Sequence, residues 1–454
     1  MRIIVIGDGK VGHTLASNLA KEEHDVVIID RSEEVLQRSE DALDVLCVHG
    51  NGADAKTLLE AGVEDADMLI AATTGDEINM LCCLVGKHLG AKYAIARIRD
   101  PEYNESLSIF QKDLGIDMAI NPEYATALEI SRLLRFPFAD EIESFAKGRI
   151  EMVGFHLHEN DLIVGTPMRD LAKSFPGLPQ VLYCAVERGD EVLIPDGNFV
   201  IEPNDRVHVA SDIVAITAYF QFLGKHIQKV KNVMLLGGGR ISYYLAKLIV
   251  PTGMRVSMVE INEEKAETLA EILPDVNVIC GDGADQELLY QEGLPEMDAF
   301  VTLCDRDEEN VIMGLYALKS GVPKVIVKNS RMGFGDLFST MGLESIISPK
   351  SITCDVILRY VRAHANSEGA NMEKLYRLMD GKAEALEFIA RAGAPYLNIP
   401  LKNLRKPEHT LISAIVRGST VIVPFGEDHI EAGDNVIVMV RKSGVSDLSE
   451  VIYP

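Results

Sequence analysis

Basic residues are scarce in this chain, and long apolar runs are missing. Its 454 residues include 44 lysines and arginines against 69 aspartates and glutamates, a formal net charge of −25. This balance disfavours a nucleic-acid-binding protein and a polybasic membrane anchor, because both need a basic surface. No stretch approaches the roughly 20 apolar residues that span a bilayer, and the N-terminal apolar run is too short for a signal peptide. We therefore expect no direct membrane insertion and no nucleic-acid partner.

Cysteine is also infrequent. The seven cysteines are odd in number and show no CxxC spacing, which argues against a disulfide framework or a zinc ribbon and favours a reducing cytoplasm. No metal site is predicted. Apolar residues make up 47% of the chain, enough for a sizeable core, and the length accommodates two to four domains of roughly 100–200 residues.

The sequence repeats itself after about 230 residues. IIVIGDGKVG at 3–12 returns as VMLLGGGRIS at 233–242, and GNGAD at 50–54 returns as GDGAD at 281–285. Further along, Arg188 and Asp205 return as Arg417 and Asp434. An ordered series of matches at a nearly constant offset indicates a tandem duplication.

Each copy divides into two parts. In the first copy, strands are predicted at 2–6, 26–30, 45–48, 67–73, 93–98 and 117–120, with helices near 10–22, 33–41 and 123–135. This alternation is typical of a parallel sheet covered by helices on both faces. Strands at 150–157, 181–186, 191–194 and 206–210, with a helix near 168–173 and a tight turn at 188–190, then indicate a small α+β module. The predicted fold class is therefore α/β, with two tandem units of a Rossmann-like domain and a small α+β module.

The corresponding domain boundaries follow from these patterns. We expect Rossmann-like domains at 1–138 and 232–367, small modules at 139–222 and 368–454, and a linker at 223–231. Apolar stripes on helix 123–135 and on its counterpart at about 351–363 are candidate docking faces between units. The alternative is that each helix packs only against its own small module.

A glycine motif follows the first predicted strand and opens the first predicted helix. The motif, a GxGxxG, consists of Gly7, Asp8, Gly9, Lys10, Val11 and Gly12. The first glycine permits a tight turn, the second lets backbone N–H groups approach a pyrophosphate, and the third lets helix and strand pack closely. The helix N-terminus adds partial positive charge. The motif predicts a nucleotide site in the first copy.

Further candidate ligands lie at the carboxyl ends of the following strands. Asp30 ends the second strand, where a carboxylate accepts hydrogen bonds from ribose hydroxyls and repels a 2′-phosphate, favouring NAD over NADP. Asp54 either contacts the adenosine or caps the next helix. Thr73 follows the fourth strand, and capping is again the alternative there. Arg97, with Arg99 nearby, ends the fifth strand and suits phosphate recognition.

The second copy is altered at these positions. Gly237 and Gly239 survive, but Ser242 replaces the third glycine, and Glu260 stands where Asp30 stood. Lys328 replaces Arg97, so a bidentate fork becomes a point charge. Serine is small, so a nucleotide site remains compatible with the sequence, and its ligand stays undetermined.

Taken together, these motifs resemble the regulator-of-potassium-conductance (RCK) family, and in particular the nucleotide-binding component of Trk potassium-uptake systems. The matching stretches include IIVIGDGKVG, EDADMLIAATTGDEINM, ARIRDPEY and INPEYATALEI, and in the second copy VMLLGGGRIS, CGDGADQELL and EAGDNVIVMV. The resemblance covers nearly the whole chain.

This resemblance implies a cytoplasmic regulator with no chemistry of its own. It would bind NAD or NADH, with ATP or ADP as further candidates, and would gate a potassium-translocating membrane subunit of the TrkH or TrkG kind. The resemblance carries over Gly7, Gly9, Gly12, Asp30, Asp54 and Arg97 as contacts in the first site. Gly237, Gly239 and Glu260 carry over to the second. It further implies a homotetramer bound peripherally at the inner face of the cell membrane through that partner.

Two rival readings are an NAD-dependent oxidoreductase and a redox-sensing DNA-binding regulator. The first needs a proton-transfer residue beside the nicotinamide, and His13, His156 and His158 have no evident acid-base partner in the sequence. The second needs a basic helix-turn-helix, which is not apparent.

Overall fold

The computed structural model describes residues 1–103, 111–146, 148–189, 191–224, 229–330, 338, 341–343, 345–365, 372–378, 382–441, 445 and 447–454. The chain forms two compact units. The first comprises Met1–Ile130, Asn232–Gly321 and Ile326–Ala365, and the second comprises Ser131–Lys231, Val322–Val325 and Asn366–Pro454. Each unit therefore draws on both copies of the repeat.

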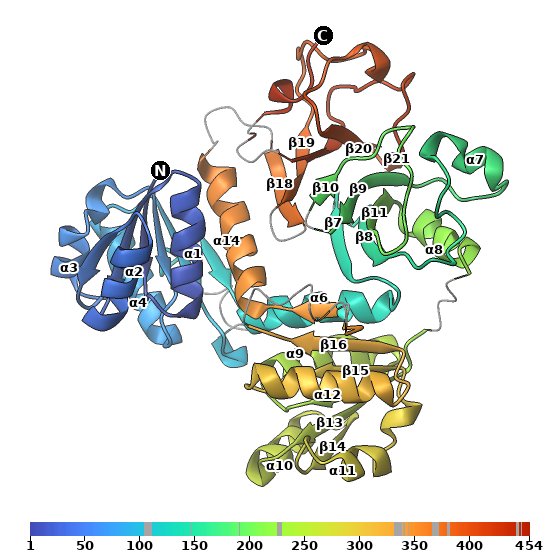
Figure 1. The fold of residues 1–454 in the computed structure, drawn as a ribbon. Coiled ribbons are helices and arrows are strands. Elements are labelled where there is room, and N and C mark those ends of the chain that lie inside the picture. Colours follow the sequence, from blue (N-terminus) through green and yellow to red (C-terminus); the bar gives the residue numbers. More distant parts are fainter. Residues whose placement is uncertain are drawn as a thin grey trace. The chain divides into compact units, whose positions relative to one another are not determined.

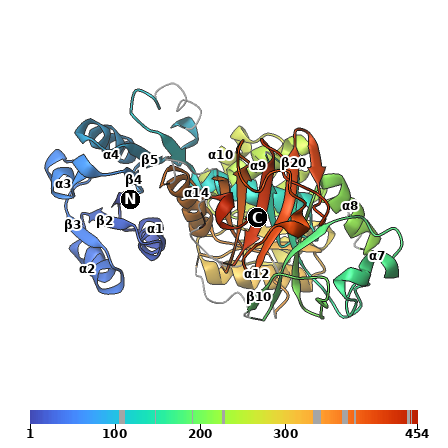
Figure 2. The same ribbon diagram turned by 90° about the horizontal axis from the view of Figure 1, so that it is seen from above.

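The first unit begins with a six-stranded parallel sheet. Its strands are β1 (Arg2–Ile6), β2 (Asp25–Asp30), β3 (Leu46–His49), β4 (Met68–Ala71), β5 (Tyr93–Arg97) and β6 (Met118–Ile120), in the order β3-β2-β1-β4-β5-β6. The connecting helices are α1 (Lys10–Lys21), α2 (Glu33–Ala42), α3 (Ala55–Glu60) and α4 (Asp76–Leu89). Helices α1 and α2 cover one face of the sheet, and α3 and α4 cover the other (Figure 2). This is the doubly wound order, in which the strand order reverses beside β1 and opens a ligand crevice.

The central strand β1 is buried on both faces, as parallel strands usually are. Ile3 and Val5 belong to the core that contains Leu15 of α1. Ile4 and Ile6 point to the opposite core, which contains residues of α3 and α4. Helices on both faces of the sheet therefore cover β1, which ends at Ile6, directly before the glycine motif.

The second copy repeats the same architecture. Its sheet consists of β12 (Asn232–Leu236), β13 (Arg255–Glu260), β14 (Val276–Cys280), β15 (Ala299–Thr302), β16 (Lys324–Lys328) and β17 (Ser345–Ile347), in the order β14-β13-β12-β15-β16-β17. Its helices are α9 (Arg240–Ile249), α10 (Glu263–Ile272), α11 (Gln286–Gln291) and α12 (Asp307–Lys319). The predicted fold class of the repeated domain is therefore confirmed.

Helix α14 (Pro349–Ala365) of the second copy packs on the first copy's sheet domain, alongside α1 (Figure 1). Cys354, Ile357, Leu358 and Val361 of α14 join the same buried core as β1 and α1. Near its end, the Arg362 guanidinium donates through Nε and Nη2 to the Glu22 carboxylate at 2.7 and 2.8 Å. Of the two alternatives left open by the sequence, α14 therefore packs on the other copy of the repeat within the chain.

The equivalent helix of the first copy is α6 (Pro122–Arg135). At its start, Asn121 donates a hydrogen bond of 2.9 Å to the Tyr244 hydroxyl on α9 of the second copy. The ring of Tyr124 meets Tyr244 edge to face, with centroids 5.6 Å apart. Each of the two helices thus begins in contact with the other copy.

The second unit contains two antiparallel sheets. The first has β7 (Glu141–Phe145), β8 (Ile150–His156), β9 (Leu182–Arg188), β10 (Glu191–Leu193) and β11 (Arg206–Ser211), in the order β10-β9-β11-β8-β7. The second has β18 (Met372–Leu378), β19 (Ala383–Ile389), β20 (Thr410–Arg417), β21 (Thr420–Ile422) and β22 (Asn435–Val440), in the order β18-β19-β22-β20-β21. One core contains residues from both sheets, including Phe145, Cys184, Ala385 and Met439.

A repeated ion pair explains part of the sequence match. Arg188 binds the buried carboxylate of Asp205 through two hydrogen bonds of 2.9 and 2.8 Å. Arg417 binds Asp434 in the same way, at 3.1 and 2.9 Å. In both copies, the hydrogen-bonded carboxylate raises the pKa of the arginine.

Two elements were not anticipated from the sequence. Helix α8 (Ile213–Phe222) is apolar on nearly all sides, so its sequence lacks the one-sided apolar stripe of an amphipathic helix. Strand β7 contains two glutamates in alternate positions, a pattern that its sequence shares with exposed loops. The helix expected near 168–173 begins as a 3-10 turn at Met168–Asp170 and continues as α7 (Leu171–Ser174). Asp190 of the predicted turn and residues 225–228 of the predicted linker lie outside the described residues. No helix in the described part is long and apolar enough to cross a membrane.

Candidate functional site

The glycine motif forms the tight turn that its spacing predicts. Gly7 has a φ of +97°, and a Cβ there would lie 3.0 Å from the Thr73 nitrogen. Gly9 caps α1, and no atom of the described residues lies within 4 Å of a Cβ built there, so its backbone is open to a ligand on that side. A Cβ built at Gly12 would lie 1.8 Å from the Gly7 carbonyl oxygen, so the helix and the turn are in direct contact there. The three glycines therefore serve three different steric purposes.

The Asp30 carboxylate holds this turn from the end of β2. One oxygen accepts a 2.7 Å hydrogen bond from the Asp8 N–H, and the other accepts one of 2.9 Å from the Ser32 N–H. Asp30 is half-buried and lines the cleft described below. Its carboxylate therefore both supports the glycine turn and borders the cleft.

The Asp8 side chain turns away from the cleft into the protein. Its Oδ2 accepts a 2.6 Å hydrogen bond from the Ser39 hydroxyl of α2, and the Ser39 oxygen lies 2.8 Å from His13 Nδ1 on α1. Asp8 Oδ1 is buried without a hydrogen-bond partner. Burial raises the pKa of Asp8, against the lowering effects of Ser39 and His13.

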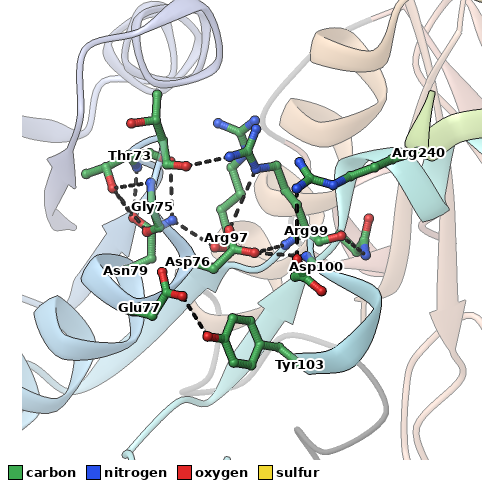
Figure 3. Close-up of polar contacts among 12 residues, drawn as sticks. Thr73, Gly75, Asp76, Glu77, Asn79, Arg97, Arg99, Asp100, Tyr103 and Arg240 are labelled. Atoms are coloured by element: carbon green, nitrogen blue, oxygen red, sulfur yellow. Dashed lines mark hydrogen bonds and ion pairs between the residues drawn. The ribbon is translucent and has the colours of Figure 1, made fainter. Parts of the chain in front are cut away.

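Asn79 organises the neighbouring edge of the sheet, as Figure 3 shows. Its buried amide accepts hydrogen bonds from the Thr73 N–H and hydroxyl at 2.9 and 2.7 Å and donates one of 2.8 Å to the Arg97 carbonyl. Asn310 repeats this arrangement between Cys304 and Lys328. The N-cap of α4 is Gly75, which has no side-chain capping bond, and Thr73 is joined to the first turn of the helix through Asn79.

Two arginines and one aspartate complete this edge. Arg97 lines the cleft with a buried Nε that has no hydrogen-bond partner. Burial, followed by the nearby charge of Arg99, lowers the pKa of Arg97, while the carboxylates of Glu123 and Asp76 act in the opposite direction. Asp76 accepts hydrogen bonds of 2.8 Å from the Arg99 and Asp100 N–H groups and thereby holds the loop after β5. Arg240 of the second copy reaches Asp100 at 3.9 Å (Figure 3).

These residues surround one cleft of about 970 Å³ within the first unit. Both copies contribute to its described lining, and basic side chains outnumber acidic ones. The basic residues are Lys10, Arg31, Arg97, Arg99, Arg240, Lys265, Lys328 and Lys350, and the acidic ones are Asp30, Glu123 and Asp305. In a chain with a net charge of −25, such a lining favours a polyanionic ligand.

The glycine turn of the second copy is surrounded by different side chains. Ser242 fits where Gly12 stands in the first copy, and its hydroxyl donates to the Gly237 carbonyl. Glu260 accepts hydrogen bonds from the Gly238 N–H at 3.0 Å and from Lys265 Nζ at 2.6 Å. Burial raises the pKa of Glu260, but these hydrogen bonds and that of Asn262 outweigh it and hold the pKa below its usual value. The acid at this position therefore already has an internal cationic partner.

The structure brings most of the predicted site residues together. Those lining the cleft are Gly7, Gly9, Lys10, Val11, Asp30, Thr73, Arg97 and Gly239. The remaining predicted residues of the two glycine turns do not line the cleft but lie within or beside the turns; they are Asp8, Gly12, Gly237 and Glu260. Asp54 is exposed and caps α3 by accepting a 3.2 Å hydrogen bond from the Thr57 N–H, and it does not line the cleft.

Several lining residues were not singled out from the sequence. Arg31 directly follows Asp30 and donates a 2.7 Å hydrogen bond to Asn51. Arg240 and Lys350 come from the second copy, and only the three-dimensional packing shows that they border the first copy's turn. The position of Arg240 within the second glycine motif was a sequence signal that could have marked it as a candidate site residue.

Fold and site together define a tandem-repeat protein with two domains of the dinucleotide-binding fold class. The TrkA-N domain model matches residues 3–122 and 233–349, and the TrkA-C domain model matches residues 152–224 and 385–453. The chain therefore belongs to the TrkA family of Trk system potassium uptake proteins.

Full-length relatives support this assignment. The chain is 33% identical to the Trk system potassium uptake protein TrkA of Vibrio alginolyticus, over 100% of this chain and 99% of the relative. It is 32% identical to TrkA homolog 1 of Methanosarcina mazei, over 99% of both chains. Among solved structures, it resembles the GsuK channel bound to NAD, with a TM-score of 0.62 and 16% identity over 97% of this chain and 76% of that one. The GsuK RCK domain has the same TM-score.

Proposed function

We propose that the chain is the nucleotide-binding regulatory subunit of a potassium-uptake system. It binds NAD or NADH in the first copy's turn and, at the cytoplasmic face, controls a separate potassium-translocating membrane subunit. Family membership supports the transport role, and the NAD-bound state named for a fold neighbour supports the ligand. ATP and ADP are weaker candidates for the same turn, because they offer phosphates and a ribose but lack the second nucleoside.

The observation that carries the ligand assignment is that Asp30 and Arg97 line the same cleft. Asp30 offers carboxylate oxygens at the strand end, and Arg97 offers a guanidinium whose buried Nε has no hydrogen-bond partner in the structure. A nucleotide supplies the matching groups, ribose hydroxyls for the acid and phosphate oxygens for the guanidinium.

Regulation without chemistry is favoured over an oxidoreductase by family membership. The described lining residues include no histidine, cysteine or tyrosine, so an oxidoreductase would have to use one of the lining carboxylates or lysines for proton transfer beside a nicotinamide. The N-terminal ends of α6 and α14 border the cleft through Pro122, Glu123, Pro349 and Lys350. A ligand that binds one arrangement of these helices more tightly would shift the equilibrium towards it.

The test is potassium flux in vesicles that contain the partner membrane subunit with this chain added outside. Adding NADH or NAD⁺ is expected to change the flux about 5- to 150-fold, the usual range of allosteric coupling. The same titration in a calorimeter must show nucleotide binding to the folded chain. Sustained oxidation of NADH by a small alcohol or acid would instead establish the oxidoreductase.

Self-association belongs to this proposal, and paired apolar side chains support it. Leu59 on α3 and Leu81 on α4 are each 44% exposed. Their counterparts at the repeat spacing, Tyr290 on α11 and Ile312 on α12, are 67% and 62% exposed. Because the same two positions stay apolar and exposed in both copies, we infer that they bind a second copy of this chain, and a homotetramer is the expected assembly.

A charge placed on this surface should break the assembly. The double variant Leu81→Asp/Ile312→Asp is expected to weaken association at least about 100-fold, because two carboxylates would have to be desolvated at the contact. Light scattering at micromolar concentration measures the mass. Lys56→Asp, an exposed change on α3 outside the pair, serves as the control. A wild-type chain that is already a strict monomer would refute the assembly.

A further inference from the structure

Three residues behind the first glycine turn form a cluster that the proposed function leaves unused. Asp8 lies within the turn and is 3% exposed. Ser39 bridges it to His13, with 2.6 Å between Ser39 Oγ and Asp8 Oδ2 and 2.8 Å between His13 Nδ1 and Ser39 Oγ. His13 Nδ1 also lies 3.6 Å from Asp8 Oδ1, which has no hydrogen-bond partner.

The second copy has lost the whole cluster in a coordinated way. At the repeat spacing, Gly238 replaces Asp8, Leu269 replaces Ser39 and Tyr243 replaces His13. A Cβ at Gly238 would lie 2.5 Å from Leu269 Cδ1, so the leucine fills the space that the acid and the serine occupy in the first copy. An apolar contact thus serves the turn equally well, and packing alone does not require the charged cluster.

The hydrogen-bond directions define what the cluster can hold. If the Ser39 hydroxyl donates to Asp8, His13 must donate from Nδ1 to Ser39, which leaves Nε2 as the proton acceptor. The His13 side chain is 42% exposed, so a proton can reach it from solvent. Histidine is the side chain that changes charge near physiological pH. The cluster carries one negative charge when His13 is neutral and none when it takes up a proton.

Among the groups that act on Asp8, only Ser39 and His13, the other members of the cluster, favour its negative charge. From β2, the Asp30 carboxylate faces Asp8 and adds a second negative charge. From β3, Cys47 contributes a thiol whose pKa is raised to about 11, chiefly by burial, so it stays neutral. From α2 the contact is the uncharged Ser39, and from α1 it is His13. Burial raises the pKa of Asp8 itself, in the same direction.

We infer that the first nucleotide site takes up a proton at Asp8, Ser39 and His13 when a pyrophosphate binds to the turn. The phosphates bring negative charge to the backbone directly above Asp8, and a proton in the cluster removes the repulsion between them. By linkage, a ligand that raises proton affinity binds more tightly as pH falls. This inference rests on the proposed nucleotide site and adds that the nucleotide affinity of the site depends on pH.

The test is calorimetric titration with NAD⁺, which has no group of its own that titrates between pH 5.5 and 8.5. In two buffers of unequal ionisation enthalpy at pH 6.5, the difference in heat gives the protons taken up. About 0.5 proton per NAD⁺ is expected, and the affinity should rise about fivefold to thirtyfold from pH 8.5 to 5.5, within the usual range of coupling. NAD⁺ that binds with no proton uptake and a flat pH profile would overturn the inference and leave the nucleotide site standing. No binding at any pH would overturn both.

Variants locate the proton. Asp8→Asn and His13→Gln should each bind NAD⁺ with proton uptake near zero, and the triple variant Asp8→Gly/His13→Tyr/Ser39→Leu installs the residues of the second copy. Thermal unfolding shows whether each variant is folded. His88→Gln on α4 removes a histidine whose Nδ1 lies 3.3 Å from the Leu84 carbonyl oxygen of the same helix, and it should leave the uptake unchanged. Undiminished uptake in both Asp8→Asn and His13→Gln would place the proton elsewhere and refute the assignment.

Discussion

Replacing Gly12 by serine is expected to abolish measurable NAD⁺ binding and to lower the free energy of unfolding by about 2–3 kcal/mol. The added Cβ would lie 1.8 Å from the Gly7 carbonyl oxygen. Both groups belong to the backbone region, so no side-chain rotation relieves the overlap, and α1 must move off the turn. A displaced turn loses two or more hydrogen bonds to phosphate, worth about 1.5–3 kcal/mol each, which corresponds to at least about a 100-fold loss of affinity.

The second copy provides the comparison for this variant. Ser242 is accommodated there and donates to the Gly237 carbonyl, so Ser242→Gly should change the unfolding free energy by less than about 1 kcal/mol. Urea unfolding and calorimetric titration of both variants give the two quantities. Wild-type affinity in Gly12→Ser would show that the helix and the turn can separate without loss, and that the contact has no role in binding.

Removing the Asp30 carboxylate is expected to weaken NAD⁺ and NADH binding by about 100-fold. The variant Asp30→Ala loses the charge-assisted hydrogen bonds to the ribose, at about 1.5–3 kcal/mol each. It also loses the 2.7 Å bond that holds the Asp8 N–H. NADPH should lose much less affinity, because the same change removes the repulsion of its 2′-phosphate. The ratio of the NADH and NADPH dissociation constants is therefore the discriminating measurement.

A matched control lies on the same strand. Asp25 begins β2 at the end away from the glycine turn, with 66% of its side chain exposed and only a 3.9 Å ion pair to Arg2. Asp25→Ala should leave both nucleotide affinities within about twofold, because an exposed pair contributes little. If Asp30→Ala weakens NADH and NADPH equally, the carboxylate organises the turn without reading the ribose.

Sequence alone was enough for the features that rest on local pattern. The apolar stretches of β1 and β2 and the glycines between them predicted a parallel sheet and a tight glycine turn, because strand burial and a positive φ each favour particular residue types. The constant offset between Arg188 and Arg417 predicted a duplicated module, and the structure shows the ion pair that each arginine makes.

The parts that could not be predicted depend on which surfaces meet. Nothing in the sequence of α14 specifies whether its apolar stripe packs on its own copy or on α1 of the other. The same uncertainty hid Arg240 and Lys350, which reach the cleft only because the two copies face each other there. Asp54 shows the converse, since a strand-end acid that suited adenosine caps α3 instead of lining the cleft.

The placement of α14 on α1 also governs how the chain is made. About 330 residues separate the end of α1 at Lys21 from the start of α14 at Pro349. At the usual pace of 5–20 residues per second, the ribosome needs about 15–65 s to synthesise that interval. Throughout it, the apolar side of α1 on the nascent first domain lacks its final cover. The nascent chain therefore exposes an apolar, chaperone-accessible surface until nearly four-fifths of it has been translated. A truncated product that lacks α14 exposes that surface permanently.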